Sequence, residues 1–275
     1  MNKRVLISTK NLVHTYKKGV TALKGINVDI HENDIISIVG QNGSGKTTLV
    51  RHFNGLLRPT SGKVYLYDED TEKQSVGSMS KKVGYVFQNP NHQIFCTTVR
   101  EELEVAPKNF GFSKEDTDAA IKRVSELMNI VGELDKHPLT LDYTTKKIVT
   151  IASVLAFNPE VLILDEPTGG LDQIGREILT KIIGIMYEQG HTVIMISHDM
   201  DYVAENSKRI IVMAQGEIIK DGSPEEVFLD ADVLRRAQIE PPQITQLDLH
   251  IDKSMRSVSL SVDSFVQKYK HHITS

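Results

Sequence analysis

The sequence contains a single cysteine, Cys96, in 275 residues. One cysteine excludes an internal disulfide framework, and this scarcity fits a reducing, cytosolic location. No apolar run approaches the roughly 20 residues that a membrane-spanning helix needs, and residues 1–8 are too short and interrupted for a signal peptide. We therefore expect no direct membrane insertion by this chain, although it remains able to dock on a membrane protein.

A surplus of basic residues is also missing. Lysine and arginine together number 32, against 36 aspartates and glutamates, which gives a formal net charge of -4. Nucleic-acid-binding domains usually carry a basic surplus, so nucleic acid is disfavoured as the main partner. The sequence also lacks internal repeats and low-complexity tracts, and its length suits one large domain or a domain with an appendage.

Short apolar runs alternate with helix-like patterns along most of the chain. Residues 35–39 are almost continuously apolar, as expected of a strand buried on both faces. Other strands are expected at 4–9, 26–30, 63–66, 83–87, 161–164, 192–196 and, as a hairpin, 209–220. Helices are expected at 46–54, after Ser113, at 144–157, at 176–187, after Ser223 and at 258–269. This alternation predicts an α/β fold with a largely parallel sheet.

A glycine-rich loop lies between the buried strand at 35–39 and the helix that follows. Residues 40–47 read GQNGSGKT and fit the pattern GxxxxGK[ST] without a mismatch. Small residues let backbone N–H groups close around phosphate oxygens, and the helix N-terminus adds positive potential. An accidental glycine-rich turn is the alternative, but this one lies between a strand and a helix, as a phosphate loop should. The residues expected to contact nucleotide are Gly40, Asn42, Gly43, Ser44, Gly45, Lys46, Thr47 and Thr48.

Two carboxylates close the apolar strand at 161–164. Asp165 is expected to hold Mg²⁺ through water, together with the hydroxyl of Thr47, and Glu166 to polarise the attacking water. Lys46 is expected to reach the β- and γ-phosphates of ATP. Adjacent acids are common on protein surfaces, so the pair alone would not indicate a catalytic site. Its occurrence together with the phosphate loop favours the functional interpretation.

With both motifs in place, residues 4–222 resemble the ABC ATPases. The residues 165–168 and 169–172 resemble that family's Walker B motif and D-loop, the latter ending at Asp172. The resemblance implies that His198 is the switch histidine, that Gln88 contacts Mg²⁺ beside the transporter contact, and that Tyr16 stacks on adenine. It also implies a P-loop NTPase (RecA-like) core with an antiparallel β subdomain, an inserted helical subdomain at about 90–158, and a small C-terminal extension.

A narrower resemblance is to the ATPases of energy-coupling-factor (ECF) importers. It rests on residues 88–95 (QNPNHQIF), 98–102 (TVREE) and 107–111 (PKNFG), and on the extension 223–275, a candidate dimerisation region. The resemblance implies an ATP-hydrolysing subunit on the cytoplasmic face of the cell membrane that drives uptake of a vitamin or metal ion. Its implied partners are a second ABC ATPase chain in a heterodimer, a transmembrane coupling subunit and a substrate-binding membrane subunit.

One segment departs from the family. The LSGGQ signature, which meets the partner's ATP, should fall at Leu141, Asp142, Tyr143, Thr144 and Thr145. Only the leucine remains, and Ile148 replaces the arginine usually found shortly after the signature. Because aspartate caps helices well, we expect Asp142 to take up N–H groups that would otherwise face phosphate. The ATP site that uses this segment should therefore be weak. The alternative is that the sequence of the segment has changed while the segment still closes adequately on that site.

Three other functions compete with transport as interpretations of the sequence. A DNA-maintenance ATPase of the same superfamily carries long coiled coils, and no sustained heptads occur here. Translation-associated relatives usually carry two cassettes, whereas this sequence has one phosphate loop. A nucleotide-binding regulatory subunit with little hydrolysis of its own stays open, since the altered signature favours it while Glu166 and His198 argue against it.

Overall fold

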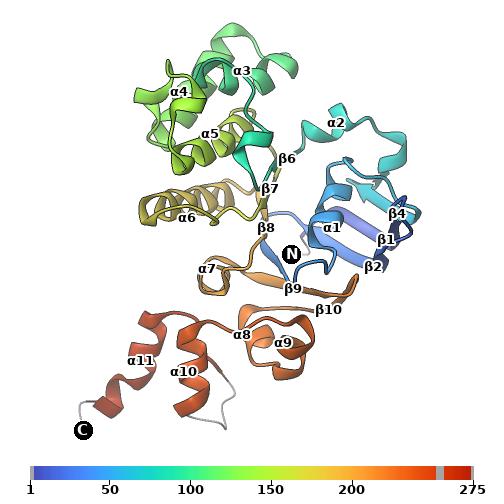
Figure 1. Ribbon diagram of the computed structural model, residues 1–275, viewed down its shortest axis with the longest axis vertical. Helices are drawn as coiled ribbons and strands as arrows, with labels where there is room; N and C mark the ends of the chain where they lie inside the picture. Colours follow the sequence, from blue (N-terminus) through green and yellow to red (C-terminus); the bar gives the residue numbers. More distant parts are fainter. Residues whose placement is uncertain (1–2, 252–256, 274–275) are drawn as a thin grey trace.

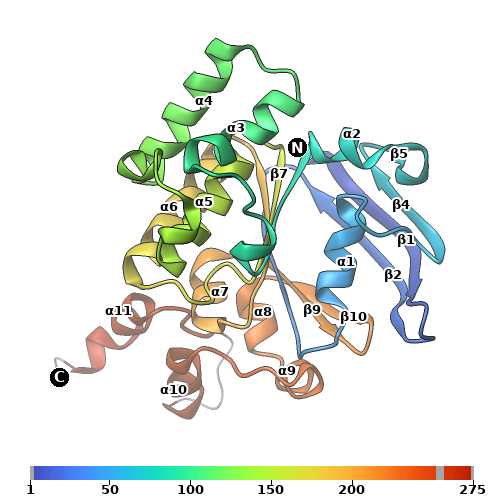
Figure 2. The same ribbon diagram turned by 45° about the horizontal axis from the view of Figure 1, so that its top comes forward.

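The computed structural model describes residues 3–251 and 257–273. A central sheet is flanked by a second sheet on one side and by a helical region at one end, and further helices follow at the opposite end (Figures 1 and 2). Within the described part of the chain, no helix is both long and apolar enough to cross a membrane. The predicted α/β architecture with a P-loop core, an antiparallel sheet and a helical subdomain is confirmed.

The central sheet has six strands in the order β10-β9-β3-β8-β7-β6. All neighbouring pairs are parallel except the hairpin of β9 and β10. Every residue of β3, β7 and β8 is buried, which explains their unbroken apolar sequences. The strands are β3 (Ile35–Val39), β6 (Val83–Val86), β7 (Val161–Asp165), β8 (Thr192–Ile196), β9 (Arg209–Ala214) and β10 (Glu217–Gly222).

The second sheet is antiparallel, in the order β2-β1-β4-β5. Its strands are β1 (Val5–Thr15), β2 (Thr21–His31), β4 (Ser61–Leu66) and β5 (Glu69–Asp70). Helix α1 (Lys46–Phe53) contributes fully buried side chains to the apolar cluster that both sheets share. The strands at 4–9 and 26–30 were predicted too short, because a register shift between Thr9 and Leu12 interrupts the alternation of apolar residues.

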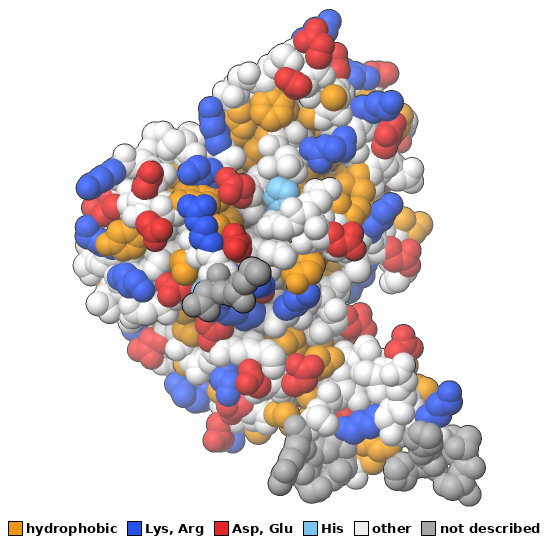
Figure 3. Space-filling view, turned by 180° about the vertical axis from the view of Figure 1, so that it is seen from behind, with side chains coloured by type: hydrophobic (Ala, Val, Ile, Leu, Met, Phe, Trp, Pro, Cys, Tyr) orange, Lys and Arg blue, Asp and Glu red, His pale blue; other side chains and the backbone are white. Residues whose placement is uncertain are grey.

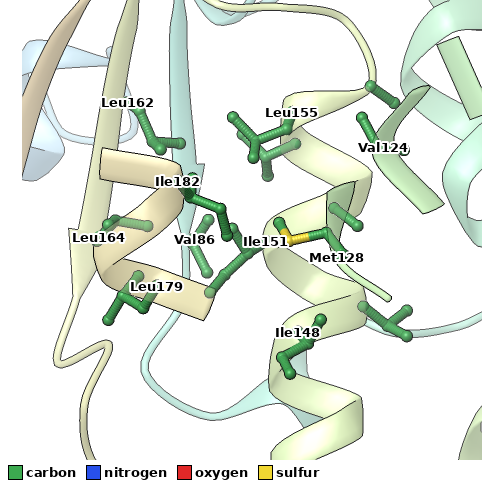
Figure 4. Close-up of a cluster of buried hydrophobic side chains, with 14 of the residues drawn as sticks. Val86, Val124, Met128, Ile148, Ile151, Leu155, Leu162, Leu164, Leu179 and Ile182 are labelled. Carbon is green, nitrogen blue, oxygen red and sulfur yellow. The ribbon is translucent and has the colours of Figure 1, made fainter. Parts of the chain in front are cut away.

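The helical region is built from α3 (Val99–Asn109), α4 (Lys114–Leu127) and α5 (Tyr143–Leu155). Helix α5 packs between α4 on one side and β7 with α6 (Gln173–Glu188) on the other (Figure 4). Ile148, which replaces the family's arginine, is 6% exposed within this apolar cluster. Shorter helical turns are α2 (Val76–Ser80) and the 3₁₀ turns Thr71–Lys73, Pro90–His92, Val131–Glu133 and Pro138–Thr140.

The chain ends in a set of short helices that follow β10. These are α8 (Pro224–Phe228), α9 (Ala231–Ala237), α10 (Gln243–Ile251) and α11 (Val262–Ile273), whereas α7 (Met200–Asn206) precedes β9. The predicted capping box at Ser223 is confirmed, with reciprocal hydrogen bonds to Glu226. The predicted helix at 258–269 begins four residues later. Residues 258–259 are instead buried without helical structure, and the Ser259 N–H donates to the Asp248 carboxylate at 2.6 Å.

Acidic and basic side chains are interspersed over the face seen in Figure 3, with small apolar areas between them. A mixed surface of this kind agrees with the small net charge of the sequence.

Candidate functional site

The glycine-rich loop follows β3 and has a backbone that only glycine can adopt at two positions. Gly40 has a φ of 142°, and a Cβ there would lie 2.0 Å from the carbonyl oxygen of Met213. Gly45 has a φ of 107°, and a Cβ there would lie 2.7 Å from the carbonyl oxygen of Ala22. At these two positions the loop backbone packs directly against the backbones of β9 and β2, which leaves no room for a side chain.

Helix α1 begins directly after this loop with its first N–H groups available. Its N-cap is Gly45, which offers no side-chain hydrogen bond to the helix. The Ser44 hydroxyl is 1% exposed and has no hydrogen-bond partner. A buried polar atom without a partner is costly, but Ser44 does not line the cavity described below. The free N–H groups of the helix are the donors that phosphate oxygens would satisfy. The loop thus fits the phosphates of a nucleotide.

Lys46 is folded over the loop and is 6% exposed. Its ammonium group donates to the carbonyl oxygens of Gly40 at 2.7 Å and Gln41 at 3.0 Å. Burial lowers the pKa of Lys46, while the carboxylates of Glu166 and Asp165 act in the opposite direction. The group is a buried cation held by carbonyls, which can exchange these contacts for phosphate oxygens.

Strand β7 ends at the two predicted carboxylates. Asp165 is 5% exposed and accepts a hydrogen bond from the Tyr85 hydroxyl at 2.7 Å. Burial and the nearby Asp165 charge together raise the pKa of Tyr85 far above its usual range, so the phenol stays protonated. Tyr85 therefore remains a donor that orients the carboxylate of Asp165.

Glu166 lies one residue further on, in a left-handed backbone conformation with a φ of 50°. Its carboxylate contacts His198 twice, at 3.1 Å from Nε2 and at 3.3 Å from the backbone N–H. Burial raises the pKa of Glu166 to about 7, although the His198 N–H and Lys46 lower it. Burial and Lys46 also lower the pKa of His198. Near neutral pH the pair is therefore a hydrogen bond between a partly protonated carboxyl and a neutral imidazole rather than a full ion pair.

These groups meet in one cavity of about 470 Å³. Its lining includes Tyr16, Asn42, Gly43, Gly45, Lys46, Thr47, Thr48, Gln88, Asp165, Glu166 and His198, all expected from the sequence. Tyr16 is 39% exposed at this lining, and its hydroxyl lies 2.9 Å from that of Thr48. An exposed ring beside the phosphate loop has the position needed to stack on a base. Gly40 and Ser44 belong to the loop but do not line the cavity.

Sequence reasoning missed part of this lining. Val20, Thr21 and Ala22 reach the cavity from the turn and strand that follow Tyr16, and Ile196 reaches it from the end of β8. Small and apolar residues of this kind carry no chemical signature in a sequence. The pairing of β1 with β2 brings the first three beside the phosphate loop. The pairing of β8 with β3 places Ile196 beside Ile38, near the start of that loop.

The altered signature segment lies at the start of α5 and not in this cavity. Asp142 is the N-cap, as predicted, and its carboxylate accepts the Thr145 N–H at 2.9 Å and the Thr145 hydroxyl at 2.7 Å. The Thr145 N–H lowers the pKa of Asp142, so this side chain is charged at neutral pH. Leu141 is 9% exposed in the apolar core.

Tyr143 and Thr144 point toward the chain's own D-loop. A Cβ on Gly170 would lie 2.5 Å from the Tyr143 ring, and the Thr144 hydroxyl lies 3.3 Å from the Gly170 carbonyl. Asp172 caps α6 through a 2.8 Å hydrogen bond from the Gly175 N–H. The signature segment and the D-loop therefore form one packed unit.

Comparison with known proteins identifies the family of this chain. A family model described as ABC transporter matches residues 23–169. The energy-coupling factor transporter ATP-binding protein EcfA of Methanocaldococcus jannaschii is 39% identical over 244 residues, covering 88% of each chain. EcfA2 of Clostridium tetani is 39% identical over 276 residues, covering 96% of this chain and 95% of the relative.

Solved structures give the same result. CbiO1 from Clostridium perfringens, described as part of the ABC transporter complex cbiONQ, matches with a TM-score of 0.76 and 32% identity, over 90% of this chain and 99% of that one. A dimeric ATP-binding cassette in a post-hydrolysis state with ADP and Pi matches with a TM-score of 0.73 and 29% identity, over 79% of this chain and 98% of that one. The chain belongs to the ABC transporter family, as an ATP-binding and ATP-hydrolysing cassette of the energy-coupling-factor type.

Proposed function

We propose that this chain is the ATP-binding subunit of an ECF-type importer and couples ATP hydrolysis to uptake of a vitamin or metal ion through membrane partners. The observation that carries the proposal is the single cavity in which Lys46, Asp165, Glu166 and His198 meet. The names of the relatives, energy-coupling factor transporter ATP-binding proteins, support the transport role. The choice of solute would lie in a separate membrane subunit.

We propose the following roles for the residues at this chain's own phosphate loop. The loop and Lys46 hold the phosphates, Tyr16 stacks on the base, Glu166 takes a proton from the attacking water, and His198 holds the γ-phosphate. The oxygens of Thr47, Gln88 and, through water, Asp165 suit Mg²⁺, which would neutralise charge on the phosphates. All of these side chains line the same cavity.

Replacement of Lys46 tests nucleotide binding directly. We expect Lys46→Ala to weaken ATP binding by about tenfold or more, since a point charge on the β- and γ-phosphates is lost. Titration of the purified full chain with a fluorescent ATP analogue measures the dissociation constant. Lys122→Ala, which removes an exposed lysine on α4, is the matched control. Unchanged affinity in Lys46→Ala would show that the phosphates bind elsewhere.

A membrane partner is proposed to dock on residues 88–99, beside the helical region at about 98–157. Phe95 is 72% exposed there, whereas Ile94 packs against the apolar core. The Glu102 carboxylate accepts the N–H groups of Phe95 and Cys96, both at 3.0 Å, and so holds this exposed loop in place. A large exposed aromatic on a fixed loop is typical of a protein contact. ATP-driven closure would move the docked helices.

The Gln93 side chain has a structural role within this segment. Its amide oxygen accepts the Phe87 N–H at 3.1 Å, and its amide nitrogen donates to the Thr150 carbonyl at 3.0 Å. Substitution of Gln93 therefore disturbs packing as well as any docking surface. His92 and Phe95, both exposed, are the positions that test docking.

We expect Phe95→Glu to reduce recovery of membrane companions by about tenfold or more while ATP binding stays unchanged, because a charge replaces an aromatic anchor. Pull-down of the tagged full chain from solubilised membranes measures this. Phe112→Glu makes the same change at a residue that is 38% exposed between α3 and α4, outside the proposed surface. Equal recovery with Phe95→Glu and the native chain would place the partner elsewhere.

The second ATPase chain is proposed to contact the extension 223–275 as well as the nucleotide sites. Helices α10 and α11 each expose two apolar residues four positions apart, a spacing that places them on one helix face. These residues are Leu247, Ile251, Val262 and Val266. We propose that these two helix faces contact the second ATPase chain, since such a contact would keep the two chains together when ATP leaves. A nucleotide-binding regulatory subunit with little hydrolysis is the second candidate, favoured only by the altered signature at 142–144.

A further inference from the structure

Lys147 is a buried cation next to the proposed catalytic carboxylate, and no sequence motif singled it out. It lies in the second turn of α5 and is 1% exposed. Its ammonium group donates to two backbone carbonyls, those of Glu166 at 2.5 Å and Gly169 at 2.8 Å. Burying a charge is expensive unless it is well bonded, so a lysine at this place requires a reason beyond packing.

The first carbonyl belongs to a residue whose backbone is unusual. Glu166 adopts a left-handed conformation, which costs a non-glycine residue free energy unless its surroundings hold it. Its N–H donates to the Ile196 carbonyl at 2.9 Å, and its carbonyl accepts from Lys147. The backbone of Glu166 is therefore fixed on both sides, and this fixes the direction in which the carboxylate reaches His198.

The second carbonyl belongs to the D-loop. Lys147 binds Gly169, and Thr144 of the same helix lies 3.3 Å from the carbonyl of Gly170. Helix α5 is itself held firmly by apolar contacts on both sides, including Ile148 and Ile151 (Figure 4). A rigid helix thus presents one cation to both the catalytic turn and the D-loop.

We propose that Lys147 is a positioning residue for ATP hydrolysis, which fixes the Glu166 turn and ties it to the signature helix and the D-loop. The proposal rests on the proposed hydrolysis at this chain's own phosphate loop. It links two ATP sites, because α5 carries the signature segment that faces the partner's ATP while Glu166 serves the chain's own. A shift of α5 is then transmitted to Glu166 through a single ammonium group.

The test compares Lys147→Met, Lys147→Gln and Lys147→Arg in the assembled complex that the full chain forms. We expect Lys147→Met to lower kcat about tenfold or more while the dissociation constant for a fluorescent ATP analogue changes less than about twofold, as for a misplaced catalytic group. Lys147→Arg, which keeps the charge and its N–H donors, should restore most of kcat. Lys147→Gln, which keeps one donor group, should restore part of it.

Lys122→Met on α4 serves as the control for loss of an exposed lysine, and Glu166→Gln is measured in the same series. A native kcat in Lys147→Met would overturn the proposal while the proposed function stands. Equal losses in kcat and ATP affinity, or no difference among the three variants, would show a merely structural role. Turnover that survives Glu166→Gln would overturn the proposed function, and the role of Lys147 with it.

Discussion

Glu166→Gln should leave ATP binding intact and slow turnover of the assembled complex by about 10²-fold or more, the usual scale for loss of a positioned base. Glutamine keeps the shape of the side chain and a hydrogen-bond acceptor for the backbone N–H of His198. It cannot accept a proton from water. Steady-state phosphate release, combined with a binding titration of the same preparation, separates the chemical step from affinity.

A matched control is Glu188→Gln, at the exposed end of α6. We expect native turnover from it. If the complex retains turnover with Glu166→Gln, ATP is hydrolysed at the partner's phosphate loop. This chain would then be the regulatory subunit that the altered signature favours.

The protonation of Glu166 makes turnover depend on pH. Burial raises the pKa of Glu166 to about 7, and only the deprotonated form can act as a base. The active fraction therefore increases as pH rises, and we expect kcat to increase about tenfold between roughly pH 6 and pH 8. Measurement of kcat at saturating ATP across this range tests the assignment, since Glu166→Gln should flatten the rise.

The second large effect concerns the altered signature. The site formed by this segment and the partner's phosphate loop should be weak, because Asp142 caps α5 with a charged carboxylate where a serine hydroxyl would face the γ-phosphate. Tyr143 and Thr144 add bulk where glycine allows close approach. Loss of one donor to a developing charge typically costs about 10²-fold in rate. We therefore expect a heterodimer with one efficient site.

The most direct test first removes ATP hydrolysis at the chain's own phosphate loop. In a Glu166→Gln background the remaining turnover comes from the partner's phosphate loop. Adding Asp142→Ser, Tyr143→Gly and Thr144→Gly should raise that turnover by about tenfold or more. Serine still caps the helix, and a melting curve checks that the two glycines leave α5 folded. Brisk turnover by the native chain as a homodimer, or no change on restoration, would show that the segment closes adequately as it is.

Much of the fold was predictable because its signals are local. The fully buried strands β3, β7 and β8 have unbroken apolar sequences, and the capping box at Ser223 marks a helix start by residue type alone. The start of α11 was not predictable, since Val258 and Ser259 are buried through contacts with distant residues such as Asp248. Apolar spacing alone cannot distinguish such a segment from the first turn of a helix.

The site residues likewise divide into those that local sequence motifs reveal and those that only the fold reveals. Lys46, Asp165 and Glu166 belong to motifs whose chemistry can be read from neighbouring residues, and the structure brings them into one cavity. Lys147 could not be found in this manner, because it stands next to another lysine and its partners are backbone carbonyls about 20 residues away. Carbonyl partners leave no trace in the sequence, so only the fold reveals them.

The central claim is that this chain supplies ATP-driven motion to membrane partners together with a second ATPase. Purification of the tagged full chain from solubilised membranes, with identification of everything that accompanies it, tests this most directly. The account predicts a second ABC ATPase chain together with integral membrane subunits, and ATPase activity in the complex that depends on Glu166. Recovery of the chain alone, or only with partners that are not membrane proteins, would contradict it.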